Sequence, residues 1–365
     1  MLTRQRDHKG QRAFAAALLL LVLGVAALQS AVAEPKPDPN GLAVEPIDVE
    51  ARFIDEFDKS RPDRRRFGRL EWRGGLVLSS PSPNFGGWSG LAIEPDGRRF
   101  VAISDAGTWM TAEIVYAGSR PAGVRGAKIG PLRGLGAGAS IRERDRDAEA
   151  VSLVDGTVDR GSLLIGFERN HRIGRFEIGE HGVAAPLGYL KLPAEARRMD
   201  VNLGFEAVGA FRSGPRKGSV IAFSERFPHR RGHHTGWLWL TGAPHKLHLT
   251  ATGGFDITDV AALADGSMLV LERRFRWTEG VKMRLRLVKA GEITPGAVLE
   301  GESLFEADMG YEIDNMEGLA VHHGPKGETV VTLISDDNFN RFLQRTVLLQ
   351  FTLVGHGMAK AASRR

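Results

Sequence analysis

Residues 149–168, EAVSLVDGTVDRGSLLIGFE, join two apolar strands through an Asp-Gly turn, and a carboxylate stands at each end of the unit. Short apolar runs separated by Asp-Gly are typical of a β-hairpin. The same form returns four more times, so this stretch is one copy of an internal repeat. The other copies are residues 89–105, 206–225, 259–272 and 317–336.

The repeats follow one another at a nearly constant distance. Their opening residues, Ser89, Glu149, Glu206, Asp259 and Glu317, are separated by 60, 57, 53 and 58 residues. A unit of this size has room for four strands, which is the size of a propeller blade. Strand-like segments are left over at 69–79 and 345–353, and pairing them would remove exposed sheet edges. We therefore predict an all-β, six-bladed β-propeller over residues 52–356, closed by pairing of the N- and C-terminal strands. A two-sheet sandwich or two smaller β domains is the alternative.

The first 33 residues have the features of a secretory signal peptide. A basic start is followed by an apolar run from Ala13 to Ala27 and by an Ala-Val-Ala site that ends at Ala33. The run is shorter than the roughly 20 residues that span a bilayer, although an uncleaved anchor is the alternative. Cleavage near Ala33 predicts a periplasmic or secreted protein. Residues 34–51 then predict a Pro-rich extended linker, and 357–365 a basic tail.

The composition excludes several classes of function. The chain has 49 basic and 44 acidic residues, a net charge of +5, but removing residues 1–33 takes away four basic residues and one acidic residue and leaves +2. A charge this small argues against nucleic-acid binding, which requires a concentrated basic face. The absence of Cys excludes disulfides, thiolate metal sites and thiol nucleophiles. No second long apolar run follows, so we predict no membrane span after cleavage. We also predict a monomer.

Carboxylates recur at equivalent places in the repeats, at the starts and ends of strands. Starts and ends of neighbouring antiparallel strands lie at one edge of a sheet, so a propeller would gather these side chains at one end of its channel. Converging anions are costly unless cations compensate them. We predict three catalytic glutamates, one of which activates water, and four other acids that bind Ca²⁺, which prefers oxygen ligands. The three are Glu149, Glu206 and Glu317; the four are Glu168, Glu225, Glu272 and Asp336.

Arginines directly follow three of these carboxylates, at Arg169, Arg226 and Arg273. A guanidinium is suited to binding an anionic ester or phosphate, so we predict that the three arginines bind the substrate. Ion pairing between neighbouring blades, with no role in binding, is the alternative.

Several motifs in this order resemble the bacterial phytase-like family, described as "esterase-like activity of phytase". The resemblance covers roughly residues 68–352 and is carried by Gly87-Trp88-Ser89-Gly90-Leu91, Asp147-Ala148-Glu149-Ala150, Gly204-Phe205-Glu206-Ala207 and Asn315-Met316-Glu317-Gly318-Leu319, each with the Asp or Glu that ends the next strand. It implies a secreted or periplasmic β-propeller and a hydrolase of phosphoric or carboxylic esters. Ser89 stands where the other repeats have an acid.

The expected function is therefore a phytase-like hydrolase, assisted by Ca²⁺, that acts on a small anionic ester or phosphoester. A non-catalytic propeller that binds a ligand or a cell-envelope partner is the second hypothesis, because one fold can host both. A lactonase-like enzyme with one buried metal and few ligands is the third.

Overall fold

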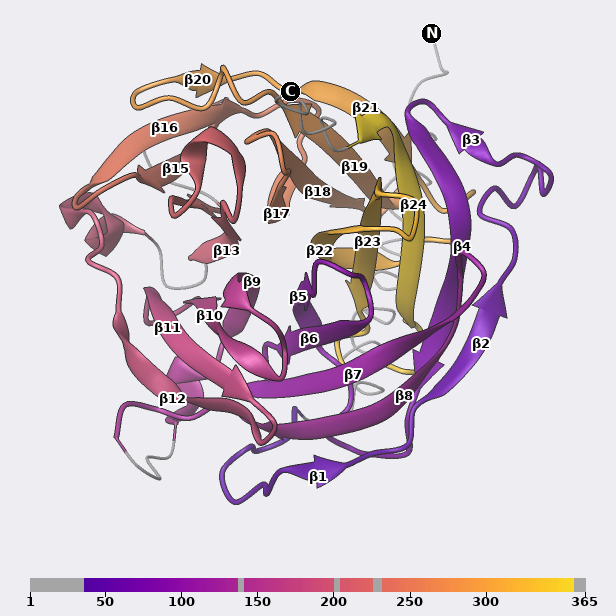
Figure 1. Ribbon diagram of the computed structural model, residues 1–365, viewed down its shortest axis with the longest axis horizontal. Coiled ribbons are helices and arrows are strands. Elements are labelled where there is room, and N and C mark those ends of the chain that lie inside the picture. The colour runs from indigo at the N-terminus through magenta and orange to yellow at the C-terminus, as the bar shows by residue number, and fades with distance from the viewer. Residues whose placement is uncertain (1–35, 137–140, 200–203, 226–231, 358–365) are drawn as a thin grey trace, which may run out of the picture.

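The computed structural model describes residues 36–136, 141–199, 204–225 and 232–357. The predicted signal peptide, Arg226 and the tail beyond residue 357 lie outside them. The described residues form five sheets arranged around a central axis (Figure 1). The innermost strands, which contact one another around that axis, are β5 (Trp88–Ile93), β9 (Ala148–Gly156), β13 (Phe205–Ala210), β17 (Asp256–Ala262) and β22 (Asn315–His323).

Each innermost strand begins a blade, and the blades are numbered in this order. Blade 1 continues outward with β6 (Arg99–Ser104), β7 (Thr108–Ala117), β8 (Arg120–Pro131) and β1 (Glu45–Pro46). Blade 2 continues with β10 (Arg160–Phe167), β11 (Arg172–Gly179) and β12 (Gly182–Tyr189). Blade 3 continues with β14 (Val220–Ser224), β15 (His233–Trp239), β16 (Pro244–Thr250) and β20 (Val298–Leu299). Blade 4 continues with β18 (Met268–Arg276), β19 (Gly280–Val288) and β21 (Glu302–Ala307).

Blade 5 corrects the prediction of six blades. It runs through β22, β23 (Glu328–Asp336), β24 (Thr346–Gly357), β4 (Leu70–Ser79) and β2 (Glu50–Ile54), and β3 (Arg66–Phe67) pairs with β4. The last repeat supplies only its hairpin and one further strand, so the early strands β4 and β2 serve as its outer strands (Figure 1). The strands near the two termini, β2, β4 and β24, therefore all belong to blade 5, and the described residues form no sixth blade.

The remaining regular elements are three short 3₁₀ helices, η1 (Glu143–Asp145), η2 (Ala194–Arg198) and η3 (Gly214–Arg216). Among the described residues, no helix has the length and hydropathy needed to cross a membrane. The segment predicted as a linker contributes β1, which pairs with β8, and the beginning of β2.

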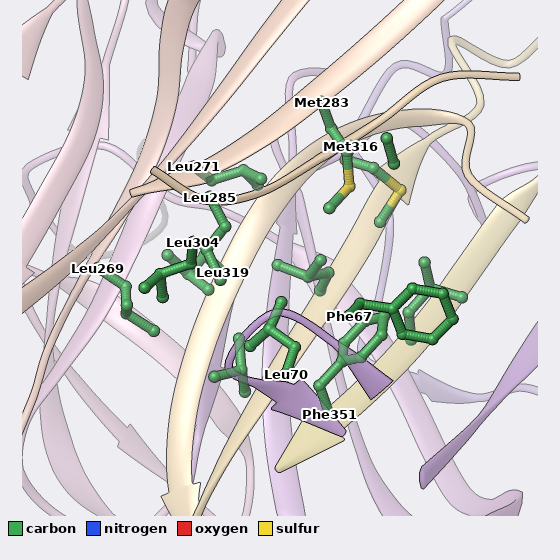
Figure 2. Packing of buried hydrophobic residues seen from close by; sticks show 14 of the residues in the cluster. Phe67, Leu70, Leu269, Leu271, Met283, Leu285, Leu304, Met316, Leu319 and Phe351 are labelled. Carbon is green, nitrogen blue, oxygen red and sulfur yellow. The ribbon is translucent and has the colours of Figure 1, made fainter. Parts of the chain in front are cut away.

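The hydrophobic core lies between blades rather than in one central mass. Five clusters of buried residues occupy the five blade interfaces. Figure 2 shows the largest, where Leu271 and Leu285 of blade 4 meet Met316 and Phe351 of blade 5. Because each blade is packed on both sides, the inner strands are held in fixed positions around the axis, and the side chains at their ends share that rigidity.

Candidate functional site

Every innermost strand carries a β-bulge near its first residue. The register with the second strand skips one residue in each blade, and an extra residue in a strand bends it and re-aims a side chain. The skipped residues are Ser89, Glu149, Glu206, Thr258 and Glu317. The bulges explain why four of the five predicted opening residues are equivalent. In blade 4 the prediction was displaced by one, because Thr258 rather than Asp259 occupies the bulge.

Asp259 has a different task. It is completely buried, and its carboxylate accepts hydrogen bonds from the backbone N–H groups of Val260 (2.8 Å) and Leu319 (2.7 Å). It therefore links the inner strands of blades 4 and 5.

The second strand of each blade ends at a second set of equivalent positions. The residue before each bulge pairs with a residue of the second strand, and the residue that follows this partner is Asp105, Glu168, Glu225, Arg273 or Asp336, in blades 1 to 5. Blade 4 thus carries an arginine where the other four blades carry an acid. Its bulge residue is Thr258, so blade 4 contributes no carboxylate at either position.

The register places Glu272, for which a metal role was predicted, apart from the other predicted ligands. Glu272 pairs with Ile257 and lies one residue before Arg273. Successive side chains of a strand point to opposite faces, so the side chain of Glu272 points into blade 4. It is fully buried, and its oxygens accept hydrogen bonds from Arg284 Nε (2.7 Å) and Arg286 Nη1 (3.1 Å). This ion-pair network is internal to the blade and leaves Glu272 without access to the channel end.

The carboxylates of the other blades meet at one end of the channel, which we call the acidic mouth. It consists of Asp105, Asp147, Glu149, Glu168, Glu206, Glu225, Glu317 and Asp336. Two groups of three acids within it each have one oxygen per residue, and those oxygens all lie within 4.8 Å of one another. The groups are Asp147, Glu149 and Glu168, and Glu168, Glu206 and Glu225. Two oxygens on opposite sides of one Ca²⁺ are about 4.8 Å apart, so each group has the dimensions of a cation site.

Burial and mutual repulsion make the charged forms of these acids unfavourable. Burial, followed by the charges of Glu206 and Asp105, raises the pKa of Glu149 well above its usual value. Burial and the charge of Glu225 do the same to the pKa of Glu206, which also shares a hydrogen bond with Glu168. The pKa of Asp336 is raised by burial and by Glu317. A bound cation would relieve this repulsion.

Among the described residues, Lys36, Arg169 and Arg273 contact the acidic mouth with cationic groups. Arg169 Nε forms an ion pair with Asp147 Oδ2 at 2.6 Å, and the ammonium of Lys36 pairs with Asp105. Arg273 donates through Nη1 to Asn315 Oδ1 (2.6 Å) and lies 3.5 Å from Glu317 Oε1. Its Nε is buried and has no hydrogen-bond partner among the described residues. Blade 4 therefore places a donor with a free hydrogen-bonding position beside the carboxylates.

The channel beneath the acidic mouth is narrow. Two residues beyond the bulges stand Leu91, Val151, Val260 and Leu319, which line a cavity of about 60 Å³. Substrate pockets usually enclose a few hundred Å³ or more. A substrate must therefore reach the carboxylates from the mouth.

The structure brings together most of the predicted site residues. Glu149, Glu168, Glu206, Glu225, Glu317 and Asp336 belong to the acidic mouth, with Arg169 and Arg273 beside it. Sequence reasoning missed Asp147, Lys36 and Thr258 as site residues. Asp147 had a signal, because it precedes Glu149 by two positions as Asn315 precedes Glu317. Lys36 had none, because nothing in the sequence places residue 36 next to residue 105.

Comparisons with known proteins give the following likenesses. The family model described as "Phytase-like: Esterase-like activity of phytase" matches residues 83–339. A comparison with curated proteins finds no significant match. Among solved structures, an endo-arabinase from Bacteroides thetaiotaomicron VPI-5482 is 13% identical with a TM-score of 0.45, over 75% of this chain and 96% of that chain. A protein of unknown function from Dyadobacter fermentans DSM 18053 is 11% identical with a TM-score of 0.39, over 88% and 97%.

Proposed function

Since the chain belongs to the phytase-like family, we propose that it is a hydrolase of phosphoric or carboxylic esters that works with Ca²⁺ bound in the acidic mouth. One observation carries the proposal: two groups of closely spaced carboxylates, each of cation-site dimensions, lie at one end of the channel, with the guanidinium of Arg273 beside them. The family description supports the ester class of substrate, and the oxygen-only donor set supports a hard cation.

The residues present fit Ca²⁺, because the acids are close together and repel one another without a cation. Glu149, Glu168, Glu206 and Glu225 would hold the ion. Bound there, it would supply Lewis-acid polarisation of the ester oxygen. This divides the three bulge glutamates: Glu149 and Glu206 belong to the cation groups, whereas Glu317 remains outside them.

Glu317 and Arg273 form the other part of the proposed site. The Arg273 side chain is 32% exposed, and its guanidinium would donate a hydrogen bond to an anionic oxygen of the substrate, which offsets the negative potential of the mouth. Glu317 lies beside it and accepts from Asn315 Nδ2 at 2.9 Å. Burial raises the pKa of Glu317, although Arg273 opposes the rise. A carboxylate in this position can take a proton from water during ester hydrolysis.

The test uses the chain from residue 34 onward, stripped of metal with a chelator. Hydrolysis of p-nitrophenyl phosphate, p-nitrophenyl acetate and phytate is measured with and without Ca²⁺. We expect a Ca²⁺-dependent gain on at least one ester that Glu206→Gln abolishes while the circular dichroism spectrum is unchanged. Glu113→Gln is the matched control, because Glu113 pairs with Arg125 in the outer part of blade 1. No turnover on any ester would refute the hydrolase and favour a non-catalytic binding propeller.

The cellular location remains a separate proposal. A signal peptide cleaved near Ala33 would deliver the protein to the periplasm or the medium. Peptide mapping of the mature N-terminus from a cell fraction tests this directly: a start at Glu34 supports export, and an intact Met1 contradicts it.

A further inference from the structure

We propose that the acidic mouth binds two divalent cations that share Glu168 as a bridging ligand. The inference rests on the proposed cation-binding role of the mouth and adds its stoichiometry and its arrangement. One cation would lie among Asp147, Glu149 and Glu168 in blade 2, and the other among Glu168, Glu206 and Glu225, between blades 2 and 3.

The geometry of Glu168 is that of a bridge. It is the single residue that belongs to both groups of closely spaced oxygens. Although it follows β10 in blade 2, its Oε1 accepts a hydrogen bond from the backbone N–H of Gly204 at 3.2 Å, at the start of blade 3. It also shares a hydrogen bond with Glu206. The side chain thus spans the boundary between the two blades, which is where a ligand shared by the two groups has to lie.

Charge balance supports two ions rather than one. The five carboxylates of the two groups carry five negative charges when ionised, and the ion pair between Arg169 and Asp147 offsets one of them. Two divalent cations would neutralise the remaining four. A single divalent ion would leave two uncompensated charges among carboxylates that are largely withdrawn from water, which is costly.

A second observation, independent of the two groups, shows that this mouth attracts cations. The ammonium of Lys36 lies against Asp105 and feels the charges of Asp147 and Glu149. The Asp105 side chain is only 10% exposed, and its Oδ1 is buried without a hydrogen-bond partner among the described residues. Its charge acts on Glu149, Glu317 and Asp336, which places it inside the cluster. A buried carboxylate oxygen with no donor is a feature of sites that coordinate a cation or its bound water.

The proposal separates this mouth from a site with one buried metal and few ligands. Two cations that share a carboxylate can stabilise both the attacking and the leaving oxygen of a displacement at phosphorus. The substrate class that makes most use of such a pair is therefore a phosphoric ester rather than a neutral carboxylic ester.

The test is the stoichiometry of Ca²⁺ binding by the chelator-stripped chain, measured by isothermal titration calorimetry and native mass spectrometry with CaCl₂ alone. We expect two Ca²⁺ per chain. Glu149→Gln and Glu225→Gln should each leave one ion bound, whereas Glu168→Gln should weaken both by at least about tenfold. Glu113→Gln should still bind two. Circular dichroism of each variant shows whether the fold is retained.

The outcomes are distinct from those of the hydrolase test. One Ca²⁺ per wild-type chain overturns the bridged pair even if hydrolysis is Ca²⁺-dependent. Two ions that survive Glu168→Gln with unchanged affinity overturn the bridging role. Two ions lost as expected, without turnover on any ester, support the cation pair and refute the hydrolase. The wild-type stoichiometry decides the proposal even if a variant fails to fold.

Discussion

Replacing Glu272 with Gln tests whether this residue supports the fold or binds metal. Its two oxygens hold Arg284 and Arg286, and all three side chains are at most 6% exposed. The substitution keeps the volume but removes the negative charge that balances two buried guanidinium groups. Removing one partner of a buried ion pair costs about 3–5 kcal/mol. With an unfolding entropy of about 2.1 cal/mol/K per residue, that loss lowers the melting temperature of a propeller of this size by roughly 4–7 °C.

The assay is thermal unfolding followed by far-ultraviolet circular dichroism, together with Ca²⁺ titration of the folded variant at 20 °C. We expect the lower melting temperature and unchanged Ca²⁺ affinity, because Glu272 faces away from the acidic mouth. Glu302→Gln on the outer strand β21 is the control, since its partner Arg69 lies 3.7 Å away and the pair is largely exposed. A variant that melts like the wild type but loses Ca²⁺ would refute the register argument and restore Glu272 as a ligand.

Two further predictions concern other charged groups. Lys36→Ala removes a cation that is half-exposed beside Asp105, so Ca²⁺ affinity should rise roughly two- to fivefold, and unchanged or weaker binding would contradict this. His322 is buried, and burial lowers its pKa to about 4. The unfolded chain binds its proton near pH 6.5, so folding stability is lost as the pH falls from 6.5 to 4, by up to about 1.4 kcal/mol per pH unit. His322→Gln should flatten that slope in urea unfolding at pH 7 and pH 5, and an equal slope in both proteins would disprove the assignment.

The sequence was sufficient for the repeat and for most of the acidic mouth. The hairpin at 149–168 and its copies set the inner strands, and the acids at their ends converge as the rotation of a propeller requires. Blade number was not recoverable in the same way. The segments 69–79 and 345–353 have equal strand character whether they form a blade of their own or complete the fifth. Only their pairing in space, with β4 beside β24, distinguishes the two arrangements.

The error in blade 4 has a more specific cause. The residue before the bulge is apolar in all blades: Trp88, Ala148, Phe205, Ile257 and Met316. Aligning the fourth repeat on Asp259 puts polar Thr258 in that place, whereas aligning it on Thr258 puts Ile257 there. Preferring a carboxylate at the opening position hid this signal. The equivalent position in the second strand then shifts by one residue as well, which places Arg273 rather than Glu272 at the mouth.

Because of that exchange, the mouth has a cationic side at blade 4, which five identical blades would not give it. If every blade had an acid both in its bulge and at the equivalent second-strand position, the mouth would repel an anionic ester from all sides, even with cations bound. Blade 4 instead has Arg273 at the mouth and no acid in its bulge, where the buried Thr258 donates to the backbone carbonyl of Met316. Blades 2 and 3 hold the two groups of closely spaced carboxylates. In the proposed chemistry the cations need anionic ligands and the substrate needs a cationic contact, and one mouth can meet both needs only if its blades differ. The departure from symmetry at blade 4 is therefore as much a part of the proposed site as the carboxylates that the other blades repeat.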